Sequence, residues 1–220
     1  MKNFICLFVA LITAPTWAQK EIAYDSITDI HRYEYRAELY DYRLNGQQNS
    51  YRTVAIKGSP FLFNKWQQGS IPYRNNRSLA LLINYNVMED YAVVSLADGE
   101  KQIYPESFMI NDLTFVRVKS QYYQALYDGK TKLLRRYTAR LDPVERNGYN
   151  ENVQYDYEYT KGDDLFLQSL DGSLVPIKLN ERSLLAKLSD QRGARNIVQE
   201  QKLNLRSEKD VIALLTKLEQ

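Results

Sequence analysis

The segment YYQALYDGKTKLLRRYTARL, residues 122–141, decides the fold that this chain is expected to adopt. Two runs rich in aromatic and apolar residues, Tyr122–Tyr127 and Lys132–Leu141, lie on either side of the pair Asp128-Gly129. Asp-Gly is favoured in the two-residue turn whose twist matches that of paired antiparallel strands. The segment therefore predicts a β-hairpin.

The same signal occurs twice more, at Asp98-Gly99 and Asp171-Gly172, again between hydrophobic runs. Further strands are expected at 79–85 and 113–118, which are rich in apolar and β-branched residues. The fold class is therefore mainly β with added helices (α+β). Residues 51–178 are predicted to form a central antiparallel sheet of roughly seven to ten strands, closing as a barrel-like or sandwich unit.

The N-terminal segment 26–44 carries two competing periodicities. Apolar or aromatic residues recur three and four apart, as on one face of a helix, at Ile27, Ile30, Tyr33, Ala37, Tyr40 and Leu44. Residues 33–39 also alternate, as a strand would. We favour an N-terminal helix within 19–50, ended by Asn45-Gly46 as a left-handed stop.

The C-terminal segment 179–220 returns to helical periodicity and is predicted to be a helical subdomain. Ser207 followed by Asp210 resembles a capping box, which marks the start of the last helix. The apolar positions fall on one side of each predicted helix. They are Leu184, Leu185 and Leu188, then Ile197 and Val198, then Val211, Leu214, Leu215 and Leu218.

The first residues have the pattern of a cleavable export signal. Lys2 provides a positive charge, an apolar stretch covers Phe4–Ala14, and Thr16-Trp17-Ala18 places small residues at −3 and −1. The uninterrupted apolar run is well short of the roughly 20 residues that span a bilayer. We expect a signal peptide at 1–18, export to the periplasm or outside the cell, and no transmembrane span after cleavage.

The composition argues against several classes of function. Lys2 is the only charged residue within 1–18, so the mature chain has 28 basic and 27 acidic side chains, and nucleic-acid binding is not expected. The basic residues of segment 130–140 are expected on the solvated face of a strand. The single cysteine lies in the signal and the only histidine is His31, so no two-histidine zinc site can form. We predict no catalytic residue, no metal site and no cofactor.

The sequence leaves two weaker chemical possibilities open. His31 with Glu34 and Glu38 would share one helical face, but such residues are more often polar pairs on a surface helix. Paired carboxylates at Asp163 with Asp164, or at Glu145 with Glu151, could serve a hydrolase, but acidic residues are common in turns.

Tyrosine is unusually frequent, with 18 residues in the chain. Tyr155, Tyr157 and Tyr159 alternate with acidic residues, so an extended backbone would place the three rings on one face. Such a row could bind a sugar by stacking, or it could be the inner face of a sheet. These three tyrosines are the only candidate binding residues that the sequence provides.

Several segments, in order along nearly all of the mature chain, resemble a family of uncharacterised exported proteins of Bacteroidetes. The segments are Leu44-Asn45-Gly46, Gly58-Ser59-Pro60-Phe61, Trp66, Gly69-Ser70-Ile71, Leu81–Tyr85, Phe115-Val116, Tyr122–Lys130, Leu133-Leu134, Ser183-Leu184-Leu185 and Asp210-Val211. The chain departs from this pattern at Tyr73–Asn76. The family has no assigned activity, so the resemblance implies export but no functional residues.

The sequence therefore predicts an exported cell-envelope protein that acts as a non-enzymatic binding or assembly component. Its partner would be an envelope protein or a glycan. The alternatives are a carboxylate-dependent hydrolase of envelope glycans and a carrier of a small ligand.

Overall fold

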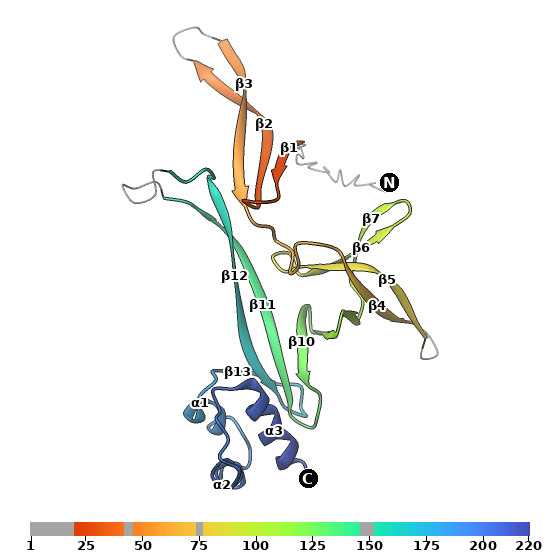
Figure 1. Ribbon diagram of the computed structural model, residues 1–220, viewed down its shortest axis with the longest axis vertical. Coiled ribbons are helices and arrows are strands. Elements are labelled where there is room, and N and C mark those ends of the chain that lie inside the picture. The colour runs from red at the N-terminus through yellow and green to blue at the C-terminus, as the bar shows by residue number, and fades with distance from the viewer. Residues whose placement is uncertain (1–19, 42–45, 74–76, 146–151) are drawn as a thin grey trace, which may run out of the picture. The chain divides into compact units, whose positions relative to one another are not determined.

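A computed structural model describes residues 20–41, 46–73, 77–145 and 152–220, with side chains for all of these except residues 20, 36–41 and 46–49. The predicted signal peptide at 1–18 lies outside the described residues. The chain divides into two compact units (Figure 1). Unit 1 comprises Met1–Gly58 and Pro143–Glu158, and unit 2 comprises Ser59–Asp142 and Tyr159–Gln220.

Unit 1 is built on three antiparallel strands. They are β1 (Lys20–Asp25), β2 (Ile30–Asp41) and β3 (Gly46–Lys57). Strand β2 pairs with β1 along its first part and with β3 along its whole length. The first residues of β12 (Tyr157–Gln168) run parallel to the end of β3, with Tyr157 opposite Ile56.

The predicted N-terminal helix within 19–50 is therefore wrong. The alternating pattern of residues 33–39 outweighed the three-and-four spacing, because β2 finds hydrogen-bonding partners on both of its edges. The segment that pairs with β2, residues 46–57, lies outside the stretch in which the periodicity was read, so the periodicity could not reveal this pairing. Gly46, expected to stop a helix, instead begins β3.

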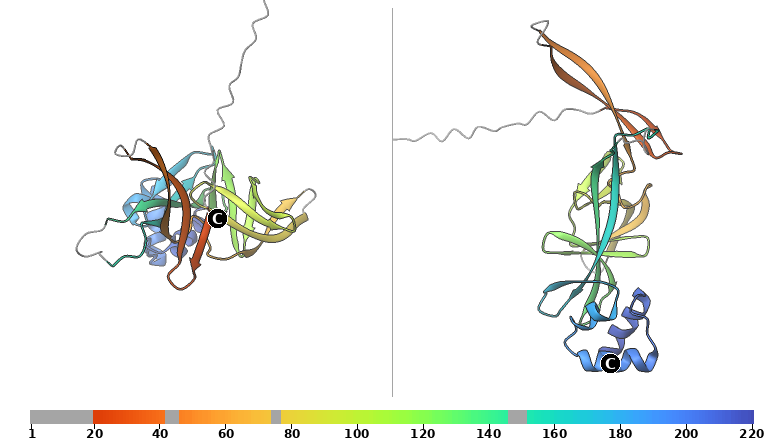
Figure 2. Two further views of the ribbon diagram at one scale, coloured as in Figure 1. Left: turned by 90° about the horizontal axis from the view of Figure 1, so that it is seen from above. Right: turned by 90° about the vertical axis from the view of Figure 1, so that its left-hand side faces the viewer.

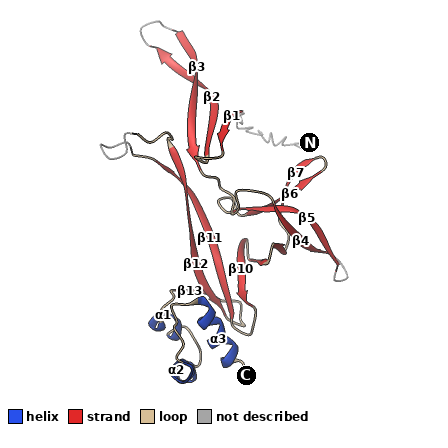
Figure 3. Cartoon of the chain, in the orientation of Figure 1, coloured by secondary structure: helices blue, strands red, loops and turns tan. Residues whose placement is uncertain are grey.

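Among the described residues, unit 2 holds most of the strands and all three helices (Figure 3). Its strands, besides β12, are β4 (Gln67–Tyr73), β5 (Arg77–Asn86), β6 (Tyr91–Leu96), β7 (Gly99–Ile103), β8 (Ser107–Ile110), β9 (Leu113–Val118), β10 (Gln121–Tyr127), β11 (Lys132–Pro143) and β13 (Leu174–Ile177). Hydrogen bonds join them in the order β12-β11-β10-β9-β8-β4-β5-β6-β7, and β13 pairs with β12. The sheet is mixed, because β3 and β12 are parallel, and it is open. The predicted closed barrel or sandwich is wrong.

The three Asp-Gly pairs do not form the expected two-residue turns. Leu96 pairs with Gly99, so the loop between β6 and β7 is Ala97-Asp98 and Gly99 belongs to the strand. The connections at the other two pairs are longer, at 128–131 and 169–173. The flanking strands are paired in each case, so the turn type, and not the strand pairing, differs from the expectation.

Aromatic rings fill one of the two cores of unit 2. Tyr85, Phe108, Phe115 and Tyr122 are fully buried, and their contacting ring centroids lie between 4.9 and 6.0 Å apart. We call these four residues the aromatic core. Burial of each large apolar side chain stabilises the fold by about 1.5–3 kcal/mol.

The C-terminal helices predicted from the sequence are confirmed. They are α1 (Glu181–Leu185), α2 (Gln191–Gln201) and α3 (Glu208–Leu218), which lie close together in Figure 2. Their leucines form the second core of unit 2 with Leu133, Leu165 and Leu167 of the sheet. Ser207 is the N-cap residue of α3, as predicted, but the capping box is not formed, because its side chain makes no cap hydrogen bond and Asp210 accepts one from the Asn204 amide. Within the described residues, no helix has the length and apolar character needed to span a membrane.

A carboxylate near the end of the chain attaches this helical group to the β10–β11 loop. Glu219 accepts hydrogen bonds from the Thr131 amide at 3.0 Å and from the Tyr127 hydroxyl at 2.9 Å. A side chain at Gly129 would meet this carboxylate, so the glycine leaves room for the Glu219 side chain in its present position. On the same sheet, Arg135 pairs with Asp163 of β12 and with Glu208 of α3.

The Glu219 attachment should be sensitive to acid. The Thr131 amide, followed by the Tyr127 hydroxyl, lowers the pKa of the Glu219 carboxyl. A lowered pKa in the folded state means that the stabilisation is present above the ordinary carboxyl range and is lost as the pH falls through the folded-state value. Glu219→Gln should therefore reduce the fall in thermal unfolding temperature between pH 7 and pH 3, measured by circular dichroism. The matched control Glu200→Gln, on the exposed side of α2, should behave as wild type, and equal pH profiles for all three proteins would contradict the assignment.

Candidate functional site

The predicted tyrosine row is divided between the two units. Tyr155 and Tyr157 belong to unit 1, and Tyr159 belongs to unit 2. Tyr155 precedes β12, and its hydroxyl lies 3.2 Å from Oε2 of Glu158 and 3.4 Å from Nζ of Lys57. Lys57 also lies 5.1 Å from the centre of the Tyr155 ring and forms an ion pair with Glu158 at 2.9 Å. Tyr155 is thus held by a local polar cluster, and its role in ligand binding stays a prediction.

Tyr157 and Tyr159 have different surroundings. Tyr157 is exposed and pairs with Ile56 of β3. Tyr159 is partly buried, and its pKa is raised by burial and, to a smaller extent, by the negative charge of Glu89. Glu89 lies in the turn after β5. Tyr159 is therefore close to a turn of unit 2 for which the sequence predicted no site.

In this region an aspartate joins two distant strands. The Asp90 carboxylate accepts a hydrogen bond from the Tyr85 hydroxyl at 2.5 Å and one from the Tyr122 amide at 3.2 Å. In the hydrogen-bonded order of the sheet, β9, β8 and β4 separate β10 from β5. The sheet therefore curls around the aromatic core and brings the β5–β6 turn, residues 87–90, against the start of β10. We call this contact the seam, and Asp90 joins its two sides.

Hydrogen bonds within residues 86–90 shape this turn. The Asn86 side chain accepts hydrogen bonds from the amides of Met88 and Glu89, and the Asp90 amide donates to the Asn86 carbonyl. Asp90 has a φ of 60°, in the left-handed region, which aspartate and asparagine tolerate better than most residues. The sequence Asn-Val-Met-Glu-Asp thus aims the final carboxylate toward β10.

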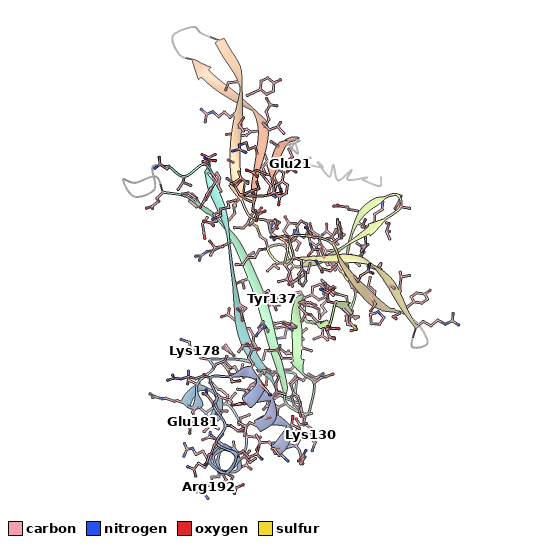
Figure 4. The ribbon with its side chains drawn as sticks, in the orientation of Figure 1. Glu21, Lys130, Tyr137, Lys178, Glu181 and Arg192 are labelled. Carbon is pink, nitrogen blue, oxygen red and sulfur yellow. The ribbon has the colours of Figure 1, made fainter. Side chains whose placement is uncertain are left out.

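A pocket of about 230 Å³ lies along this seam, and we call it the seam pocket. Figure 4 labels Tyr137, one of its lining residues on β11. The residues come from the β5–β6 turn, the start of β10 and the middle of β11. They are Val87, Met88, Glu89, Asp90, Gln121, Arg136, Tyr137, Thr138 and Ala139.

The phenols around the seam are donors and not bases. Burial, together with the nearby Asp90, raises the pKa of Tyr85, and burial raises the pKa of Tyr122 to about 12. Both hydroxyls therefore stay protonated at neutral pH. The Tyr122 hydroxyl donates to the Pro105 carbonyl at 2.6 Å, and that of Tyr137 donates to the buried side chain of Gln124 at 2.8 Å.

The residues weighed for metal binding or acid-base catalysis are not brought together. His31 lies on β2, where its Nδ1 is 2.7 Å from Oε1 of Glu21, so the proposed helical face with Glu34 and Glu38 does not exist. Among the described residues, no group of three or more His, Cys, Asp or Glu side chains could hold a metal ion. Asp163 forms an ion pair with Arg135, and Glu151 lies outside the described residues.

Unit 1 presents a second feature, a stack of rings on β1 and β2. The ring centroids of Tyr24 and His31 are 4.2 Å apart with planes inclined by 25°, and those of His31 and Tyr33 are 6.1 Å apart. Tyr24 is 48% exposed, and Ile22 and Ile27 beside it in sequence are exposed as well. We call Tyr24, His31 and Tyr33 the aromatic ladder.

The comparisons with known proteins identify no relative. No family model, no curated protein and no solved structure matches this chain.

The seam makes a direct prediction about stability. Asp90→Ala leaves the buried Tyr85 hydroxyl without its acceptor and should lower the free energy of unfolding by about 1–3 kcal/mol, measured by urea denaturation. Asp90→Asn keeps an acceptor and tolerates positive φ, so it should cost less. The control Asp98→Ala, in an exposed loop where Asp98 pairs only with Lys101, should cost under about 0.5 kcal/mol. Equal losses for Asp90→Ala and Asp98→Ala would show that the seam is not held by Asp90.

Proposed function

We propose that the chain is an exported cell-envelope protein that acts by non-covalent binding, as a binding or assembly component. The observation that carries this proposal is the aromatic ladder of unit 1 together with its exposed apolar neighbours. The resemblance to uncharacterised exported proteins of Bacteroidetes supports the same compartment.

The ladder has the physical properties of a contact surface. Aromatic rings offer a large area for burial at low cost in conformational entropy, while tyrosine hydroxyls remain able to form hydrogen bonds. The hydroxyl of Tyr24 donates to Oδ1 of Asp29 at 3.0 Å, and the stacking on His31 further restrains the ring. A surface that is already ordered loses less entropy when a partner binds.

The register of the strands gives a matched control for this surface. His31 pairs with Ile56 and Tyr33 pairs with Val54, so even-numbered residues of this part of β3 share the ladder's face. Tyr51, which is 70% exposed, therefore points to the opposite face of the same ribbon.

Removal of the ladder should weaken binding to the envelope. Tyr24→Ala with Tyr33→Ala should reduce co-sedimentation of the purified mature protein with a washed envelope fraction by about tenfold or more in affinity. Tyr51→Ala should stay within about twofold of wild type. Equal sedimentation of the ladder variant and wild type would contradict the proposal. So would release of soluble sugars or peptides from the envelope by the wild-type protein, because that would indicate a hydrolase.

Export makes a separate prediction. The signal pattern that ends at Ala18 leads us to expect a mature chain that begins at Gln19. Intact-mass measurement of the protein isolated from the envelope of the producing cells would check this. A full-length chain that begins at Met1 and remains in the cytoplasmic fraction would contradict export.

A further inference from the structure

We propose that the seam pocket binds a free α-amino acid in its zwitterionic form. The pocket is lined by two carboxylates, those of Glu89 and Asp90, and by one guanidinium, that of Arg136. An α-amino acid carries a carboxylate and an ammonium group close together. Its carboxylate can pair with the guanidinium, and its ammonium group can pair with the carboxylates. This inference goes beyond the proposed function, because the seam pocket belongs to unit 2 and the aromatic ladder to unit 1.

Arg136 differs from the other arginines of β11. Arg135 pairs with Asp163 and Glu208, and Arg140 pairs with Asp142. Arg136 is partly buried, yet no described residue forms a salt bridge or hydrogen bond with its guanidinium. A guanidinium presents donors in a planar fork that matches a carboxylate, so Arg136 can take the carboxylate of the ligand.

The position of Arg136 at the seam is supported by its electrostatic effect. Its positive charge opposes the effect of burial on the pKa of Tyr85 and of Tyr123. The guanidinium therefore lies within electrostatic range of the hydroxyl that Asp90 holds. No N···O distance of 4.0 Å or less joins Arg136 to Glu89 or Asp90, so the opposite charges of this pocket remain separated.

The carboxylates can take the ammonium group. Oδ1 of Asp90 accepts from Tyr85 and Tyr122, whereas Oδ2 has only a longer contact of 3.3 Å to the Tyr122 amide. The Glu89 side chain is exposed. Burial is the largest cause of the raised pKa of Tyr91 and Tyr159, and the negative charge of Glu89 contributes to both. Glu89 also takes part in one side-chain hydrogen bond, with Tyr91. Glu89 is thus the carboxylate with the most remaining acceptor capacity.

The size and the neutral lining of the pocket favour a small ligand. Its volume of about 230 Å³ is below the ~300–1,000 Å³ that is typical of sites for drug-sized molecules. Gln121 and Thr138 add hydrogen-bonding groups, and Val87 and Ala139 add apolar surface for a short side chain. The larger pocket between α1 and α2, about 390 Å³, is lined mainly by exposed residues.

The first test compares probes on the complete mature protein by isothermal titration calorimetry. L-alanine and L-leucine are the zwitterionic probes, L-alaninamide lacks the carboxylate and N-acetyl-L-alanine lacks the ammonium group. We expect a zwitterionic probe to bind, and each analogue to bind at least about tenfold more weakly, because each loses one charged pairing. The proposal is overturned if neither amino acid binds up to about 20 mM, where a millimolar site would be filled. Equal binding of L-alanine and L-alaninamide would also overturn it.

The second test assigns the binding to Arg136. Arg136→Gln should weaken amino-acid binding at least about tenfold, whereas Arg140→Gln, on the same strand but outside the pocket, should stay within about twofold. Glu89→Gln should also weaken binding, since Gln cannot neutralise an ammonium group. The unfolding midpoint of each variant without ligand confirms that the comparison is between folded proteins. Unchanged affinity in folded Arg136→Gln would refute the assignment.

Discussion

The hydrogen bonds of the Asp90 carboxylate are the constraint on which the curvature of the sheet around the aromatic core depends. They join the turn after β5 to the start of β10, although three strands separate β5 from β10 in the order of the sheet. An open sheet of this kind has no continuous ring of backbone pairing to fix its curvature. Here the Asp90 side chain joins the β5–β6 turn to β10, beside the packed rings of the aromatic core, and the seam pocket lies along the same contact.

Four of the tyrosines of unit 2 share a structural explanation. Several of them bury a ring while the hydroxyl donates to a specific acceptor, so each contributes to packing and also joins two elements. Their acceptors are Asp90 for Tyr85, the Pro105 carbonyl for Tyr122, Glu219 for Tyr127 and Gln124 for Tyr137. A phenylalanine at these positions would keep the packing but would leave the acceptor without its partner.

The two candidate surfaces suit different ligands. The aromatic ladder is a stack in which Tyr24 is exposed and His31 and Tyr33 are half-buried, and its exposed apolar neighbours favour a macromolecular partner with a broad face. The seam pocket is small and carries both signs of charge, which favours a compact zwitterion. Because the ladder and the pocket belong to different units, a failure of one interpretation leaves the other intact.

The sequence by itself determined the elements whose signal is local. The strands around 79–141 and the three C-terminal helices follow from runs and periodicities within a few residues. Segment 26–44 was misread because β2 is stabilised by β1 and by segment 46–57, and both pairings are tertiary. The lengths of the turns and the openness of the sheet likewise depend on which strands pair with one another, and a local pattern does not reveal this.

The sites were decided by tertiary structure alone. The lining residues of the seam pocket come from 87–90, 121 and 136–139, so no spacing in the sequence brings them together. In the sequence, Arg136 is one member of a basic stretch whose side chains are expected to face solvent, and nothing there separates it from the others. Pairing of its neighbours with Asp163, Glu208 and Asp142 is what distinguishes it. The Arg140–Asp142 pair is local, but the contact with Asp163 needs β12 beside β11, and the contact with Glu208 exists only once α3 has docked on the sheet.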